Sequence, residues 1–356
     1  MDGRAWARAL RDPETEALLL DLHASLLSSL GRIPPALALA DEGRTIAAQR
    51  GHPDLITALG ARRAFVLYYA GDLRAVHDAT ATCAPEGTSA DLGRSFLGFS
   101  PSLYLGMLAG ICAMEFGRFD QARTLLQRAA HASAAAGDLV VSAWVVACAG
   151  PLAHASGVAV DSAIEQSELA LTELRGVAAP LAVAAAGLSL GIALLAGRRF
   201  DDAREVLGNA LATTRSRSQA WLVEAPICAA LSRALTGSNR ADKALEPARY
   251  AVTFARLRSA RLLELDALAA LADALIASGD TAALSEAGLR LSEMTTLIEE
   301  TGAERFRAWR HRSLSLLAER RGDEPRACAE AALAAEIFAQ HGAAPLAAAM
   351  RRRAEG

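Results

Sequence analysis

Apolar residues recur along this chain at steps of three and four positions, which is the spacing of one face of an α-helix. Ala122, Leu125, Leu126 and Ala129 follow this rule, and the positions between them are mostly polar. Other segments, such as 182–195, are apolar nearly all round, as expected of a helix that neighbours cover on every side. The pattern therefore predicts amphipathic helices that alternate with buried helices.

Glycine residues divide this helical pattern into units of nearly constant length. The junctions lie at intervals of 40 to 46 residues: Gly31, Gly71, Gly117, Gly157, Gly197, Gly237, Gly279 and Gly322. Glycine ends a helix by adopting the left-handed conformation, and an Asp that follows several of these glycines suits the first turn of the next helix. About 20 residues later a second glycine often stops that helix, as at Gly51, Gly137, Gly176, Gly302 and Gly342.

Each unit is therefore predicted to be a helix A, a tight turn, a helix B and a looser connection. Because such units stack rather than close around one core, we expect one superhelical domain over residues 1–356. The predicted fold class is all-α, a solenoid of about eight antiparallel helical hairpins with a period of about 40 residues. Two segments depart from the rhythm. The Pro- and Gly-rich stretch 84–99 predicts an irregular insertion, and 343–356 predicts a C-terminal capping helix.

The composition agrees with a helical protein of the cytoplasm. Hydrophobic residues make up 52% of the sequence but aromatic residues only 5%, and Ala and Leu, which favour helices, supply most of the apolar content. A formal net charge of -3 gives no overall attraction to nucleic acid or to an anionic membrane. Five widely spaced cysteines predict free thiols in a reducing compartment, and no apolar signal-peptide core follows Met1.

Two uncharged stretches, 139–160 and 176–197, are long enough to cross a membrane. Both are rich in Ala and Gly, and Pro151 and Pro180 interrupt them. A helix buried between stacked hairpins has the same composition. We therefore predict no membrane association.

One catalytic pattern occurs literally, Gly-Leu-Ser-Leu-Gly at 187–191. A nucleophilic serine in this pattern lies on a strained turn between a strand and a helix, whereas Ser189 falls within an Ala- and Leu-rich helix. The seven histidines show no H-E-x-x-H pattern and no Cys/His cluster at zinc-ligand spacing, so we expect them to cap helices or lie on the surface. No catalytic residue, cofactor or metal is expected, and an unrecognised helical enzyme is a minor alternative.

The junctions resemble those of tetratricopeptide repeats, in which small residues lie where helices A and B cross. Gly110, Ala122 and Ala129 occupy the family's small positions in the third unit, and Gly191 does so in the fifth. The long units resemble the repeat domain of the large ATP-dependent LuxR-type, maltose-regulator-like transcriptional regulators. Segment 336–356 is similar to the stretch that leads, in those regulators, to a DNA-binding domain, but neither that domain nor a nucleotide-binding P-loop occurs here.

This resemblance implies that helix A lines a concave face with an apolar part and a polar part. The residues projected onto this face are Phe65, Tyr68, Tyr69, Tyr104, Met107, Ile111, Met114, Arg233, Trp309 and Arg312. The apolar part would hold an amphipathic helix or an apolar small molecule. Packing in the core between hairpins is the competing interpretation, because one turn of register error exchanges groove and core positions.

The resemblance also implies a non-catalytic sensor module of a bacterial transcriptional regulator or signalling protein. Its partner would be a protein, a peptide or a small-molecule effector on the concave face. Direct binding of nucleic acid is not expected, and homodimerisation is left open. The alternative is an architectural protein–protein scaffold or a homo-oligomerisation domain.

Overall fold

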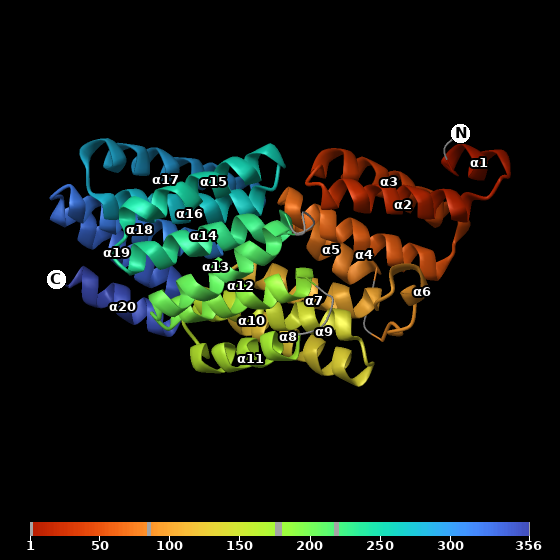
Figure 1. The fold of residues 1–356 in the computed structure, drawn as a ribbon, viewed down its shortest axis with the longest axis horizontal. Helices are drawn as coiled ribbons and strands as arrows, with labels where there is room; N and C mark the ends of the chain where they lie inside the picture. The colour runs from red at the N-terminus through yellow and green to blue at the C-terminus, as the bar shows by residue number, and fades with distance from the viewer. Residues whose placement is uncertain (1–2, 84–86, 175–179, 217–220, 356) are drawn as a thin grey trace.

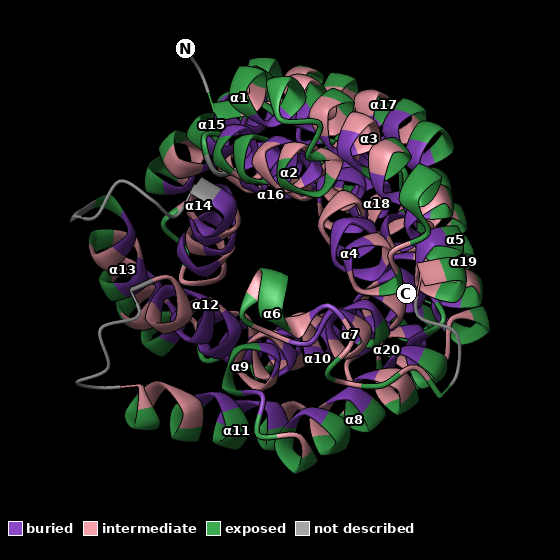
Figure 2. Ribbon diagram, turned by 90° about the vertical axis from the view of Figure 1, so that its right-hand side faces the viewer, coloured by how far each residue is buried: buried purple, intermediate pink, exposed green. Residues whose placement is uncertain are grey.

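The computed structural model describes residues 3–83, 87–174, 180–216 and 221–355, and every regular element within them is a helix. Most of these helices pair into eight antiparallel hairpins (Figure 1). In each hairpin helix A lies on the inside of the superhelix and helix B on the outside (Figure 2). The predicted all-α solenoid is confirmed.

Seven hairpins have one continuous helix A and one helix B. They are α2 (Pro13–Ser29) with α3 (Ile33–Arg50), α4 (Pro53–Ala70) with α5 (Leu73–Cys83), α7 (Pro101–Glu115) with α8 (Phe119–Ala135), α12 (Pro180–Ala196) with α13 (Phe200–Ser216), α14 (Trp221–Gly237) with α15 (Ala241–Leu257), α16 (Arg261–Ser278) with α17 (Thr281–Thr301), and α18 (Arg305–Arg320) with α19 (Glu324–Gln340). In the fourth hairpin helix A is split into α9 (Leu139–Ala147) and α10 (Ala149–Ser156), and α11 (Val160–Glu173) follows. The short helices α1 (Gly3–Ala9), α6 (Arg94–Leu97) and α20 (Ala344–Ala354) lie outside the hairpins.

Most junction glycines end helix A as predicted, with φ between 68° and 87°. The prediction is wrong at Gly197 and Gly237, where Arg198 and Asn239 adopt the left-handed conformation instead, each with φ of 58°. The helices still end at these junctions, α12 at Ala196 and α14 at Gly237, but the left-handed residue lies one or two positions after the glycine. Gly237 serves packing instead, because a Cβ there would lie 2.4 Å from the Phe200 ring. Gly176 lies outside the described residues.

Pro151 explains why helix A of the fourth hairpin is broken at Cys148. Proline has no N–H for the carbonyl four positions earlier and its ring crowds that turn. At the break, the N–H of Gly150 donates to Ser189 Oγ on α12 at 3.0 Å. The two helix backbones approach so closely that a Cβ on Gly150 would lie 1.9 Å from the Ser189 carbonyl oxygen. Leu139–Ser156, the described helical segment that is long and apolar enough to cross a membrane by composition alone, is thus two helices packed against α12.

The superhelix makes more than one turn, so its first hairpins lie against its last (Figure 2). Helix α4 contacts α16, α7 contacts α18, and α10 contacts α20. The facing turns need glycine for this approach. A Cβ on Gly31 would lie 2.4 Å from Arg258 Cδ, and one on Gly71 would lie 2.8 Å from Thr301 Cγ2. The curvature of the array therefore decides which inner helices face one another.

Segment 84–99, where an irregular insertion is predicted, contains turns and the short α6 in its described part, residues 87–99. Its position is set by Gly93, whose N–H donates to Asp54 Oδ1 at 2.8 Å. Helix α20 lies within 343–356, the segment predicted to cap the C-terminal end.

We expect Gly150→Ala to destabilise the fold by about 1–3 kcal/mol, because the added Cβ meets backbone atoms that cannot move aside. Gly208→Ala is a matched control, since a Cβ there meets nothing within 4 Å in the middle of α13. That change should stabilise the helix by up to about 1 kcal/mol. Denaturant unfolding followed by circular dichroism measures both, and equal effects would contradict the tight contact.

Candidate functional site

An aromatic group lies on the inner helices α4 and α7. Phe65 and Tyr69 meet at 5.0 Å between ring centroids, and Tyr68 and Tyr69 at 5.2 Å. Tyr104 of α7 is 6.4 Å from Phe65 and 5.3 Å from Phe99. The structure thus brings four of the projected residues together and adds Phe99, which comes from the segment predicted to be an insertion.

The tyrosines of this group are uncharged. Tyr104 is buried, whereas Phe65, Tyr68 and Tyr69 are half-buried. Burial raises the pKa of all three phenol groups above the ordinary value, and the carboxylate of Glu115 raises that of Tyr68 further. The group therefore offers apolar ring faces and hydroxyl donors, which suits a ligand with both apolar and polar parts.

A polar group lies on α14, α16 and α18, and consists of Arg233, Asp266, Asp273 and Arg312. Arg233 binds the Asp266 carboxylate with two hydrogen bonds of 2.8 and 3.2 Å. Arg312 donates to Asp273 at 3.1 Å. Burial works to raise the pKa of Asp266, but the Arg233 guanidinium and its hydrogen bonds leave that pKa below the ordinary value. The carboxylate of Asp266 is therefore ionised.

His154 and Trp309 join this polar group through a stacked pair of rings. The rings, from α10 and α18, lie 4.9 Å apart with an angle of 16° between their planes. Arg312 lies 5.4 Å from the centre of the Trp309 ring. Burial, followed by the positive charge of Arg233, lowers the pKa of His154 to about 3. The imidazole is thus neutral near pH 7, and the expectation that the histidines cap helices or lie on the surface is wrong for His154.

One buried ion pair connects the aromatic group with the last hairpins. Arg305 Nε donates to Glu115 Oε2 at 2.6 Å, across a sequence separation of 190 residues. The Glu115 side chain is 1% exposed and that of Arg305 15%. The Tyr68 hydroxyl donates to the other carboxylate oxygen at 3.4 Å. We call the aromatic group, the polar group, His154 and Trp309 together the concave face.

Two projected residues contribute to the core rather than to this face, since Met107 and Met114 are 3% and 4% exposed within the main core cluster. Ile111 is half-buried against the same cluster, as Phe65, Tyr68 and Tyr69 are, and stays a candidate. We therefore leave Met107 and Met114 out of the candidate site. The reason is that neighbouring helices cover α7 on most sides, so that its apolar pattern does not distinguish groove from core.

Sequence reasoning missed Glu115, Arg305 and His154. One signal was available, since Glu115 is the single charged residue in the otherwise apolar helix α7. A charge in such a helix requires a partner, because an unpaired buried charge is costly. The sequence did not predict which residue this partner is, because Arg305 belongs to a helix that meets α7 only after a full turn of the superhelix.

Ser189 of the Gly-Leu-Ser-Leu-Gly pattern is a buried structural residue. It lies inside α12, is 0% exposed, and shares a 2.9 Å hydrogen bond with Ser167 Oγ in addition to accepting from Gly150. Its hydroxyl has no access to a substrate. Ser189 therefore holds the broken helix A of the fourth hairpin against α12.

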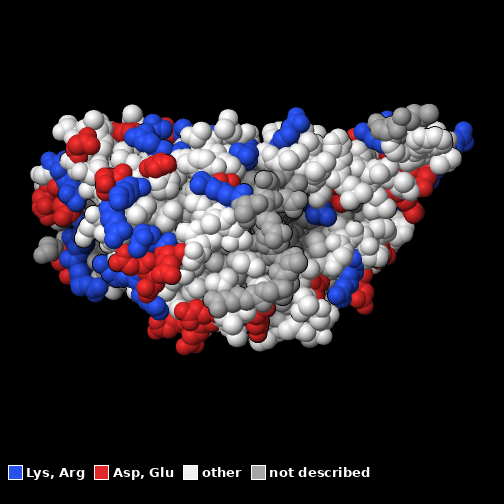
Figure 3. All heavy atoms as spheres, viewed as in Figure 1, with Lys and Arg blue, Asp and Glu red and all other residues white. Residues whose placement is uncertain are grey.

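The structure also bears on metal ions and nucleic acid as ligands. Among the described residues no three His, Cys, Asp or Glu side chains are grouped so that they could hold a metal ion. On the outer face drawn in Figure 3, basic and acidic side chains are interspersed over the C-terminal hairpins. That face therefore carries no extended basic field of the kind that binds nucleic acid.

No family model and no curated protein matches this sequence. Among solved structures, a Rap protein complexed with competence and sporulation factor superposes with a TM-score of 0.60 at 13% identity, over 96% of this chain and 97% of that chain. A Rap conjugation gene regulator of a plasmid, in complex with a Phr peptide, superposes with a TM-score of 0.52 at 14% identity, over 95% and 94%. The chain is a TPR-like α-solenoid over nearly its whole length.

We expect Glu115→Gln to destabilise the protein by about 1–3 kcal/mol, because Arg305 would keep its buried charge without a counter-ion. Adding Arg305→Met should recover part of this loss, since it removes the unpaired charge. Denaturant unfolding of the single and double variants measures the effect.

An exposed pair provides the control. Glu286→Gln removes the carboxylate that binds Arg249, whose side chain is 52% exposed, and should change stability by less than about 1 kcal/mol. If the Glu115 and Glu286 variants lose equal stability, the buried pair has no special role.

His154 should make stability depend on pH. Its pKa of about 3 lies below the ordinary 6.5, so the unfolded chain binds more protons between these values. The part of the free energy of unfolding that depends on a neutral His154 is fully present above about pH 6.5 and is lost as the pH falls. From about pH 7 to 5, the wild type should lose up to about 2 kcal/mol more than His154→Phe. Unfolding titrations at both pH values test this, and identical losses would refute it.

Proposed function

We propose that this protein is a non-catalytic regulatory module that binds a peptide, or an extended segment of a partner protein, on its concave face. The observation that carries the proposal is the combination of half-buried aromatic rings with paired charges on one inner surface. Apolar side chains of a peptide would pack on the Phe65, Tyr68 and Tyr69 rings. Its backbone amides would pair with Arg233 and Asp266, whose side chains remain 16% and 23% exposed.

Two features support a peptide over a compact apolar molecule. The concave face extends over inner helices from α4 to α18, a length that suits an extended ligand. Its polar residues are charged and partly exposed, which suits main-chain hydrogen bonding. The two Rap structures with this fold, which were solved with competence and sporulation factor and with a Phr peptide, are consistent with such binding.

We further propose that binding serves signalling or transcriptional regulation in the cytoplasm. Cys112, Cys148 and Cys228 are buried free thiols, as suits a reducing compartment. A partner protein would bind the peptide-bound and peptide-free forms with different affinity. The reason is that small rotations between stacked hairpins set the curvature of the array.

The proposal is tested by screening an immobilised library of short random peptides and measuring the selected sequences by isothermal titration. Trp309→Ala and Tyr69→Ala should each weaken binding by at least about tenfold, because aromatic anchors dominate such interfaces. Both variants change the concave face without removing a buried charge.

Tyr250→Ala is the matched control, since this tyrosine lies on the outer helix α15 and is 38% exposed. It should bind the selected peptides as the wild type does. A screen that selects no peptide, or selected peptides that bind the Trp309 variant unchanged, would refute the proposed function.

A further inference from the structure

Within the described residues, three prolines interrupt a helix rather than begin one. Pro151 lies at the break between α9 and α10, Pro226 lies inside α14, and Pro247 lies inside α15. The first two belong to inner helices and the third to an outer helix (Figure 2). Proline lacks the N–H that would donate to the carbonyl four positions earlier. Each of these prolines therefore leaves one main-chain carbonyl without its helical donor.

At the break in the fourth hairpin this carbonyl belongs to Ala147, four positions before Pro151. The carbonyls on either side of it have donors. That of Val146 accepts from the Ser189 hydroxyl at 3.3 Å, and that of Cys148 accepts from a backbone N–H at 3.1 Å. The break thus leaves the Ala147 carbonyl as an acceptor for a partner outside the helix.

The Ala147 carbonyl lies on the concave face. Ala147, Pro151 and His154 follow one another at steps of four and three, so they share one face of the inner helix. His154 stacks on Trp309 within the concave face. Ala147 and Pro151 are only half-buried, so neighbouring helices do not cover this face completely.

Pro226 produces the same arrangement on α14. The carbonyl that loses its donor is that of Leu222, one turn before the proline. Leu222, Pro226 and Arg233 are separated by four and seven positions and therefore share one face of the helix. Arg233 binds Asp266 in the polar group, and Pro226 is half-buried. Two inner helices thus direct a carbonyl without its helical donor towards the same face.

The side chains of the polar group leave a need for such acceptors. Both carboxylate oxygens of Asp266 already accept hydrogen bonds from Arg233. Those of Asp273 accept from Arg312 and from the Ser313 hydroxyl. An extended peptide presents backbone N–H groups that need acceptors, whereas an α-helix uses these groups internally. The carbonyls of the interrupted inner helices therefore suit an extended ligand.

We propose that the main-chain carbonyls of Ala147 and Leu222 accept hydrogen bonds from backbone N–H groups of an extended peptide on the concave face. The prolines make this site by releasing the two carbonyls from their helices. Recognition through the main chain does not depend on the ligand's side chains, which leaves sequence preference to the aromatic group. This inference rests on the proposed function and specifies how that ligand is held.

The test pairs proline variants with altered peptides. Pro226→Ala restores an N–H for the Leu222 carbonyl, and Pro151→Ala does so for that of Ala147. In peptides selected from the random library, each backbone N–H is replaced in turn by an ester oxygen. At one position the ester should weaken binding to the wild type by at least about fivefold, because an acceptor loses its donor. Isothermal titration measures each pair.

The same ester should weaken binding to the Pro226→Ala variant by less than about twofold, since the restored helical bond already uses the carbonyl. Pro151→Ala should do the same at a different peptide position. If its melting temperature falls, because Gly150 and Ser189 pack tightly beside it, the Pro226 variant alone decides. The matched control is Pro247→Ala on the outer helix α15, which should bind every peptide as the wild type does.

Two results would overturn the inference while leaving the proposed function intact. In the first, every ester weakens binding to the wild type and to the proline variants equally, so that the two carbonyls contact only water. In the second, circular dichroism shows that the selected peptides bind as α-helices, whose N–H groups are not free. A library that yields no peptide refutes the proposed function and this inference with it.

Discussion

The first three hairpins of this protein meet the last three after one turn of the superhelix, and the closeness of that approach decides which inner helices face one another. The turns that face one another carry Gly31 and Gly71, where a Cβ would overlap Arg258 or Thr301. Glycine thus serves twice at these turns, since it also ends the helix in the left-handed conformation. The contact brings α4 to α16 and α7 to α18. Without it the inner helices would line an open spiral rather than one continuous face.

The Glu115–Arg305 ion pair joins α7 to α18 at this contact. Burying two charges costs desolvation energy that their attraction barely offsets, so the pair contributes more to position than to net stability. It connects Tyr68 on one side with the last hairpins on the other. The charges of the concave face are compensated before any ligand arrives, and its tyrosines and His154 are neutral near pH 7. Recognition there would depend on ring faces and on the direction of hydrogen bonds.

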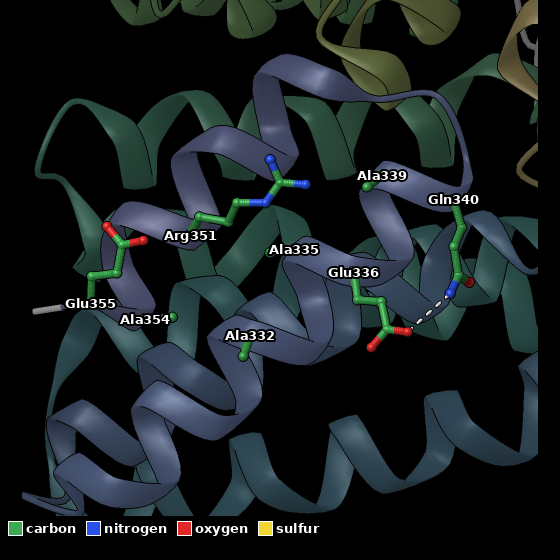
Figure 4. A pocket seen from close by; sticks show the side chains of 8 residues that line it. All are labelled: Ala332, Ala335, Glu336, Ala339, Gln340, Arg351, Ala354 and Glu355. Atoms are coloured by element: carbon green, nitrogen blue, oxygen red, sulfur yellow. Dashed lines mark hydrogen bonds between the residues drawn. The ribbon is translucent and has the colours of Figure 1, made fainter.

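The two ends of the array follow from the same repeat geometry. Each hairpin is stabilised mainly by its neighbours, so the terminal helices are those with the least cover. Trp6 and Leu22 remain exposed, and a hollow lined by α19 and α20 keeps an open side (Figure 4).

Much of the fold could be predicted from local sequence. The junction glycines, the capping residues and the period of about 40 residues each reflect interactions within a few positions, so the eight hairpins were predicted. Ser189 was correctly placed in a helix for the same reason. Small errors arose where packing overrode the local rule, as at Gly237, which makes room for Phe200 while Asn239 takes the left-handed turn.

The residues of the concave face could be predicted only in part. Phe65, Tyr68, Tyr69 and Tyr104 were predicted to lie together, but Met107 and Met114 are core residues and His154, Glu115 and Arg305 were missed. The sequence by itself determined the hairpins and their order, because these depend on hydrogen bonds and side chains close along the chain. Only the tertiary structure decided that Glu115 meets Arg305 and that His154 stacks on Trp309. Those contacts depend on small rotations that accumulate from hairpin to hairpin. The total rotation cannot be predicted from any local sequence pattern.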